Sequence, residues 1–350
     1  MWRRTTGRWR RAMSALALVE GRSPALPASL QWRRFTATDA AAWGEPPHPL
    51  LPRGVLPADV EDPVTVTAPV SADAVLLGKF DRGRQVRLRA FYAEPGLSLR
   101  LQAGSRHPGR PHGVSRSVRA AQVVGEHRPE LMPTMVDHGT LFRGRTAYLV
   151  EETVHGRSPR SPEEVFRAMA VVARELAAVQ RAVGVSPRRL SEVVPEAFRE
   201  RWRQAVADGH VPPKMAARVD RIIDRDELLE VSFTHGDLVS SNVLWVEDRV
   251  VLIDWEYADV RPIAFDLAKI HVNAGPAGPA VAVLEDALDG LVGRGEGHYS
   301  LVEQLLLAHV VVLSRLEARM ERARAAQRLE PLRQQTHKRV RSMRALFALL

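Results

Sequence analysis

The segment from residue 233 to residue 256 limits what this chain can fold into more than any other part of it. It reads FTHGDLVSSNVLWVEDRVVLIDWE. A polar loop after residue 234 runs into a short apolar strand, and a turn precedes a second apolar strand that ends at Asp254. Asp237 and Asn242 stand five residues apart in the loop. The pattern predicts a loop carboxylate, a loop amide and a strand-end carboxylate around one hairpin.

Oxygen-bearing side chains in this arrangement suit phosphoryl transfer. A hydroxyl group that attacks a γ-phosphate must be held in line, and a loop carboxylate can accept its proton. Magnesium offsets the charge of the phosphate oxygens and prefers hard oxygen ligands, such as an amide oxygen and a second carboxylate. Ordinary turns are also rich in Asp, Asn, Gly and Ser, so one such motif alone would carry little weight.

Three motifs in order make the chain resemble the aminoglycoside phosphotransferase family, which includes choline-kinase-like enzymes and shares the protein-kinase-like fold. The family's loop H-G-D-x-x-x-x-N stands here at 235–242. Its metal motif stands at 253–256 as IDWE, and a downstream FDLA follows at 265–268. In this last motif, Asp266 would brace the loop from the start of a helix.

The resemblance implies roles for individual residues. Asp237 would be the catalytic base, and His235 would orient its loop. Asn242 and Asp254 would be magnesium ligands, with Glu256 as a further contributor at the metal. The cofactors implied are ATP or GTP with Mg²⁺, and the reaction implied moves the γ-phosphate to a hydroxyl of a small molecule such as an aminoglycoside, a sugar or an amino alcohol.

The rest of the sequence predicts an α+β fold with two lobes, of which the first is small and β-rich and the second larger and helical. The first lobe is expected at 66–150, because residues 86–92 and 97–101 alternate around a Pro-Gly turn and predict a hairpin. Residues 1–65 hold arginine clusters and a proline-rich stretch, so they are expected to form a poorly ordered or peripheral extension. The hinge and the helical lobe are expected at 151–350.

The helical lobe and the hinge have their own sequence signals. Ser161 followed by Pro162 and two glutamates predicts a helix start with a side-chain cap. By resemblance, residues 151–156 form the interlobe hinge, where the backbone around Glu152 and Val154 would hydrogen-bond adenine. A plain buried strand is the alternative interpretation of that segment.

Two features depart from the family pattern around the nucleotide phosphates. The strand that should carry a phosphate-binding lysine has Arg100 instead, and the helix expected to supply its glutamate reads SVRAAQ at 117–122. Lys79, in the loop at 78–85, is a second candidate phosphate ligand. Two interpretations stay open: an active kinase that uses Arg100 or Lys79, or a pseudokinase that binds a nucleotide or a partner without turnover.

Composition adds a third interpretation, from a different class. The chain carries a formal charge of +9, nearly all of it from arginine, and the arginine-rich termini could bind a polyanion. Glutamates interrupt the C-terminal arginines, so we favour a solvated helix and expect no nucleic-acid partner. The chain has no cysteine and no apolar run of about 20 residues, so we expect a cytoplasmic protein without a membrane span. The acceptor and the oligomeric state do not follow from the sequence.

Overall fold

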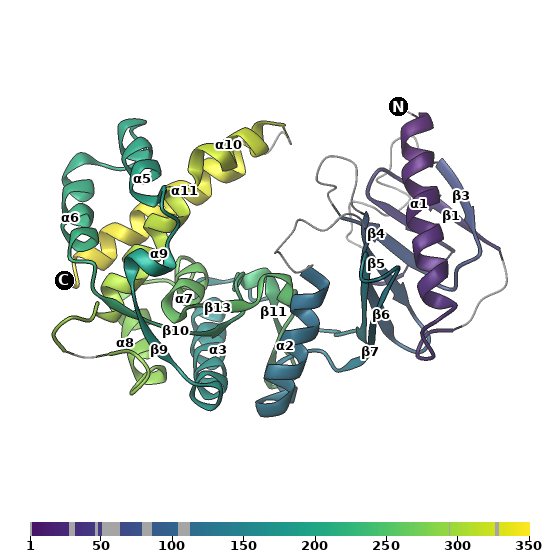
Figure 1. The fold of residues 1–350 in the computed structure, drawn as a ribbon, viewed down its shortest axis with the longest axis horizontal. Coiled ribbons are helices and arrows are strands. Elements are labelled where there is room, and N and C mark those ends of the chain that lie inside the picture. The colour runs from purple at the N-terminus through teal and green to yellow at the C-terminus, as the bar shows by residue number, and fades with distance from the viewer. Residues whose placement is uncertain are drawn as a thin grey trace. The chain divides into compact units, whose positions relative to one another are not determined.

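The chain folds into two compact units, residues 1–155 and 156–350. The boundary between them falls within the segment expected to be the hinge. The structure, a computed structural model, describes residues 2–27, 32–45, 48–50, 64–78, 86–103, 113–293, 295–325 and 329–350. Figure 1 draws the first unit in purple to blue and the second in teal to yellow. The α+β architecture, with a β-rich first part and a helical second part, is as predicted.

The first unit is built on one antiparallel sheet of eight strands in the order β3-β1-β2-β4-β5-β6-β8-β7. Its strands are β1 Arg33–Ala37, β2 Ala41–Trp43, β3 Val64–Ala68, β4 Ala74–Leu77, β5 Val86–Tyr92, β6 Leu97–Ala103, β7 Met135–Leu141 and β8 Thr146–Glu152. Its helices are α1 Trp2–Glu20, α2 Gly113–His127 and the 3₁₀ turn η3 Pro129–Leu131.

The predicted hairpin is confirmed as β5 and β6, and its alternation gives the sheet two faces. One face carries Leu88 and Leu101, which are opposite each other and lie in a core that α1 also enters. The other face carries Ala147 and Leu149 of β8, which pack against Val114 of α2. Each face of the sheet is therefore covered by a helix of the same unit.

Helix α1 differs from the poorly ordered or peripheral extension that we expected for residues 1–65. Helix α1 buries Trp9, Met13 and Leu16, each at most 2% exposed, against the sheet. The indole N–H of Trp9 donates to the carbonyl of Thr38 at 2.7 Å. Apolar residues at helical spacing stand between the arginines, and that stripe outweighs the arginine content in deciding the fold. Residues 51–63, which hold most of the proline-rich stretch, lie outside the described residues.

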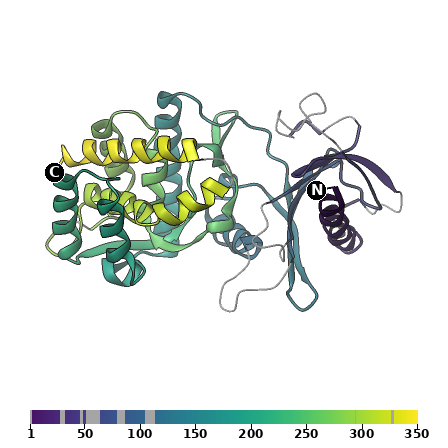
Figure 2. The ribbon, with the colours of Figure 1, turned by 90° about the horizontal axis from the view of Figure 1, so that it is seen from above.

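The second unit is mostly helical. Its helices are α3 Pro162–Val183, α4 Leu190–Val193, α5 Phe198–Ala207, α6 Pro213–Asp224, α7 Ile263–His271, α8 Ala277–Ala287, α9 Leu301–Leu313, α10 Leu316–Ala325 and α11 Leu329–Phe347. Its strands and 3₁₀ turns are β9 Ser186–Arg189, β10 Leu228–Thr234, η4 Ser240–Asn242, β11 Val243–Val246, β12 Arg249–Leu252, η5 Trp255–Tyr257 and β13 Asp259–Pro262. The predicted cap of α3 is confirmed, because Ser161 Oγ accepts from the backbone N–H of Glu164. Figure 2 shows α10 and α11 in yellow at the end of the chain.

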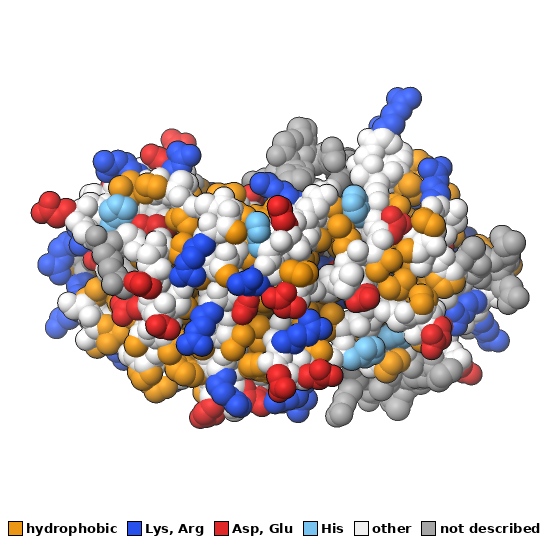
Figure 3. All heavy atoms as spheres, turned by 90° about the horizontal axis from the view of Figure 1, so that it is seen from below, with side chains coloured by type: hydrophobic (Ala, Val, Ile, Leu, Met, Phe, Trp, Pro, Cys, Tyr) orange, Lys and Arg blue, Asp and Glu red, His pale blue; other side chains and the backbone are white. Residues whose placement is uncertain are grey.

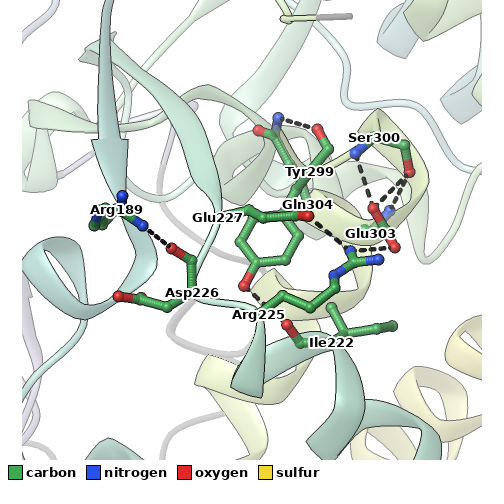
Figure 4. A network of polar contacts seen from close by, with 9 residues as sticks. All are labelled: Arg189, Ile222, Arg225, Asp226, Glu227, Tyr299, Ser300, Glu303 and Gln304. Carbon is green, nitrogen blue, oxygen red and sulfur yellow. Dashed lines mark hydrogen bonds and ion pairs between the residues drawn. The ribbon is translucent and has the colours of Figure 1, made fainter. Parts of the chain in front are cut away.

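A polar network fixes the end of α6 and the start of β10 to the start of α9 (Figure 4). Arg225 pairs with Glu227 at 3.1 Å and with Glu303 of α9 at 2.5 Å. The hydroxyl of Tyr299 donates to the carbonyl of Ile222 at 2.9 Å. These contacts hold β10, the strand that leads into the polar loop at 235–242, in place from its far end.

The surface carries charges of both signs. On the face drawn in Figure 3, Lys and Arg side chains lie among Asp and Glu side chains. In the part of the chain that the structure describes, no helix combines the length and apolar character that crossing a bilayer requires.

Candidate active site

The loop that follows β10 is organised around a buried histidine. His235 is fully buried, and its Nδ1 accepts from the backbone N–H of Asp237 at 3.2 Å. Its Nε2 lies 2.9 Å from the carbonyl of Ile253, so the ring is neutral with its proton on Nε2. Burial lowers the pKa of His235, which agrees with this tautomer. Through these two contacts His235 joins the backbone at Asp237 to the residue that follows β12.

Gly236 lets the chain pass very close to the segment after β12. Its φ is +80°, and a Cβ at this position would lie 2.0 Å from the carbonyl oxygen of Tyr257. Its backbone N–H donates to Asp266 Oδ2 at 3.0 Å, from the first turn of α7. Asp266 thus braces the loop from the start of a helix, as expected from the FDLA motif.

A lysine on α7 holds the carboxylate of Asp237. Lys269 Nζ lies 3.0 Å from Asp237 Oδ1 and also donates to the carbonyl of Gly236. The Asp237 side chain is 38% exposed and that of Lys269 is 21% exposed, so the pair borders solvent while one carboxylate oxygen stays anchored. A carboxylate in this position can accept a proton from a bound hydroxyl, because a ligand can still reach it.

The two expected metal ligands lie beside each other at the end of the β11–β12 hairpin. Val243 pairs with Leu252, and the N–H of Ile253 donates to the carbonyl of Asn242 at 3.0 Å, so Asp254 is the next residue beyond this contact. The Asn242 amide nitrogen donates to the carbonyl of Asp237 at 2.9 Å, which leaves its Oδ1 to act as a ligand.

Asp254 has a left-handed backbone, with φ 68° and ψ 53°. Such a conformation costs a non-glycine residue about 1 kcal/mol or more and is concentrated at functional sites. Glu256 lies half-buried in the turn η5 that follows. Among the described residues no three His, Asp or Glu side chains form a metal-binding group. An amide oxygen and a carboxylate suit Mg²⁺, which in phosphoryl-transfer sites draws its remaining ligands from phosphates and water.

In the first unit, Arg100 has a buried acidic partner that sequence reasoning missed. Arg100 Nε donates to Glu151 Oε1 at 2.9 Å, and Arg89 reaches the same oxygen at 3.1 Å. Arg100 is 9% exposed and Glu151 4%. The acid therefore comes from β8, the neighbour of β6 in the sheet, and α2 has only Glu126, which is exposed.

The other expected nucleotide ligands have different surroundings. Glu152 is exposed, and its backbone N–H donates to the carbonyl of Thr134 at 3.0 Å. Val154 follows the end of β8, and its backbone groups make no hydrogen bond within the described chain. Lys79 lies outside the described residues, with the rest of its loop from residue 79 to residue 85.

Sequence reasoning also missed Lys269. A weak signal was present, because Lys269 is one of only four lysines in a chain that uses arginine almost everywhere else. It also stands three residues after Asp266, on the same face of a helix, so both side chains can reach one loop.

Residues 99–300 match a family model described as a phosphotransferase enzyme family. A choline/ethanolamine kinase family protein from Mesorhizobium loti is 16% identical, with 77% of this chain and 92% of that one covered and a TM-score of 0.43. A thermostable mutant of aminoglycoside phosphotransferase APH(4)-Ia, solved with AMP-PNP and hygromycin B, is 14% identical, with 77% and 93% covered and a TM-score of 0.46. An ethanolamine kinase from Plasmodium vivax is 12% identical, with 77% and 81% covered and a TM-score of 0.42. No curated protein matches the chain.

Proposed function

This chain belongs to the phosphotransferase enzyme family, and we propose that it moves the γ-phosphate of ATP or GTP to a hydroxyl group of a small molecule. Asp237 accepts the proton of the attacking hydroxyl. Asn242 and Asp254 hold Mg²⁺, with Glu256 close by. Bound Mg²⁺ would offset charge on the phosphate oxygens.

The observation that carries this proposal is the way Asp237 is held. Its backbone N–H donates to the neutral ring of His235, its carbonyl accepts from Asn242, and its carboxylate accepts from Lys269. Phosphoryl transfer depends mainly on positioning and charge, so a carboxylate fixed through its main chain and side chain is suited to receive a proton from a bound hydroxyl.

Arg100 takes the place of the usual phosphate-binding lysine in this proposal. Its guanidinium is oriented by Glu151, and a strand arginine paired with an acid resembles in function a lysine paired with a helix glutamate. Glu152 and Val154 remain proposed adenine contacts, and Lys79 a proposed phosphate contact. The Glu151 pair supports an active kinase over a pseudokinase, because the arginine does have an acidic partner.

The test measures nucleotide binding through thermal unfolding, with and without Mg²⁺. It uses the parent chain and Asp254→Ala. Nucleotide at about 100 times Kd should stabilise the parent by about 2.7 kcal/mol. The proposal requires this gain to depend on Mg²⁺ and to shrink in Asp254→Ala. If the parent chain binds neither ATP nor GTP, both interpretations fail. The kinase would have no phosphate donor, and the pseudokinase would have no nucleotide.

A further inference from the structure

The last two helices carry Arg319 and Arg339, whose charges act on Asp237 and which make no ion pair with a carboxylate in the part of the chain that the structure describes. Arg339 of α11 contacts Nδ1 of His309 at 3.2 Å, and His309 is fully buried in α9. Burial, together with the positive charge of Arg339, lowers the pKa of His309 well below its usual value, so its ring is neutral. The guanidinium of Arg339 is therefore anchored by a neutral group and keeps its full charge.

A chain of polar contacts places Arg339 relative to the loop. Ser342, one turn further along α11, lies 3.3 Å from Nε2 of His309 and 3.4 Å from Nδ1 of His271. His271 is on α7, two residues after Lys269, which holds the carboxylate of Asp237. The helix that carries Arg339 is thus fixed to the helix that anchors Asp237.

Arg319 of α10 belongs to the same cluster. The charge of Asp237 acts on both Arg319 and Arg339, and Arg319 acts on Arg339. Burial and the positive charge of Arg319 lower the pKa of Arg339 to about 10. Within the described residues neither arginine makes an ion pair with a carboxylate; Arg319 has only a 3.5 Å contact with Gln335. The charges of two guanidinium groups therefore act on an acid that already pairs with the Lys269 ammonium.

A half-buried guanidinium without an anion is costly, and proteins normally pair such groups or use them to bind ligands. Arginine forks match the geometry of phosphate and carboxylate oxygens. A cationic acceptor would meet repulsion from three positive groups near the proposed base. An anionic acceptor would offset their charge and would be held within reach of Asp237.

We propose that the acceptor is a hydroxylated anion, with its phosphate or carboxylate group bound by Arg319 and Arg339 and its hydroxyl directed to Asp237. This inference rests on the proposed kinase function. The same two arginines could instead bind the phosphates of the nucleotide, since the chemistry recognised is the same. The experiment must separate these two sources of phosphate.

The first arm uses inorganic phosphate as the probe in isothermal titrations at constant ionic strength, with and without saturating AMP-PNP and Mg²⁺. Phosphate should bind the parent chain in both conditions. Arg339→Gln and Arg319→Gln should each weaken its binding at least about tenfold. Arg341→Gln, which removes an exposed arginine from the same helix, should leave it unchanged. Arg319 lies on a different helix and does not contact His309, so Arg319→Gln keeps the test valid if Arg339→Gln does not fold.

The second arm compares turnover of glucosamine, glucose and glucose 6-phosphate, and of further hydroxyl compounds in the same cation, neutral and anion series. In each series that is phosphorylated, the anion should have the highest kcat/KM, and Arg319→Gln should remove that advantage while leaving KM for the nucleotide unchanged.

Three results would overturn the inference: phosphate binding that AMP-PNP abolishes, phosphate binding that neither arginine variant weakens, or preferred turnover of neutral or cationic acceptors. A separate result would contradict the kinase assignment, namely the absence of Mg²⁺-dependent AMP-PNP binding. Phosphate binding without nucleotide remains measurable in that case and decides whether the arginine pair is an anion site.

Discussion

The ammonium group of Lys269 lies 3.0 Å from Oδ1 of Asp237 and joins helix α7 to the loop after β10. One oxygen of the carboxylate is thereby fixed, and the pair is close to solvent. A lysine in contact with a general base can orient it and can also stabilise negative charge that builds up nearby.

Replacement of Lys269 by methionine should therefore lower kcat by about 10- to 100-fold, because the carboxylate loses its orientation. Lys269→Arg should keep part of the activity, since it retains a positive donor. KM for the nucleotide should change little in both variants. Steady-state kinetics with a saturating acceptor would check this, and a methionine variant with the parent kcat would show that the contact has no role in turnover.

Gly236→Ala should damage the loop more than the loss of a left-handed glycine can explain. The new Cβ would meet the carbonyl oxygen of Tyr257 at 2.0 Å. Gly209 is the matched control, because its φ is +75° and nothing lies within 4 Å of an added Cβ. We expect about 1 kcal/mol of destabilisation for Gly209→Ala from backbone strain alone, and at least about 2 kcal/mol for Gly236→Ala with loss of activity. Equal losses in urea unfolding would contradict the close approach.

Glu151→Gln should destabilise the first unit strongly. It removes the buried negative charge that accepts from Arg100, which is 9% exposed, and from Arg89. Breaking such a pair from one side costs about 3–5 kcal/mol, whereas an exposed pair contributes at most about 1 kcal/mol. Asp286→Asn breaks the exposed pair with Arg174 at 3.5 Å and is the control. If the double variant Glu151→Gln with Arg100→Met were no more stable than Glu151→Gln, the explanation by the lost charge pair would fail.

The buried histidines should make the protein less stable in mild acid. Burial lowers the pKa of His271 to about 4, so the folded state stays neutral while the unfolded chain takes up a proton near pH 6.5. The stability that depends on this histidine is complete above pH 6.5 and is lost as the pH falls toward 4. At pH 5 the loss from His271 alone is about 2 kcal/mol.

The groups around His271 are Ser342, the neutral ring of His309 and, beyond that ring, Arg339. Urea unfolding at pH 7.5 and pH 5 would check the prediction in His271→Gln and in the exposed control His337→Gln. Only the first variant should reduce the difference in unfolding free energy between the two pH values. The same difference in both variants would mean that His271 is protonated in the folded state.

Local patterns predicted a large part of the fold. The β5–β6 hairpin, the cap of α3 and the segment from β10 to η5 all depend on neighbours in the sequence, which alternation, capping and turn residues describe. Helix α1 was missed because arginine and proline content outweighed its apolar stripe in our interpretation. Its stripe contacts strands that are far away in the sequence, and composition does not describe such contacts.

The contacts that fix the side chains of the site could not be predicted from a single sequence. Arg100 and Glu151 are 51 residues apart, and Lys269 and Asp237 are 32 residues apart. The sequence suggested the chemistry of Arg100 and Asp237 but not their partners. The acid for Arg100 was sought on a helix, and Lys269 was missed. Strand order and helix packing decide these pairs, and neither follows from periodicity.

The most direct test of the central claim is acceptor-dependent nucleotide turnover by Asp237→Asn, with nucleotide affinity measured on the same preparation. The substitution keeps the shape of the side chain and removes its ability to accept a proton. We predict a fall in turnover of at least about a hundredfold with nucleotide affinity essentially unchanged. Turnover equal to that of the parent chain would show that Asp237 is not the base and would contradict the phosphotransferase mechanism proposed for this site.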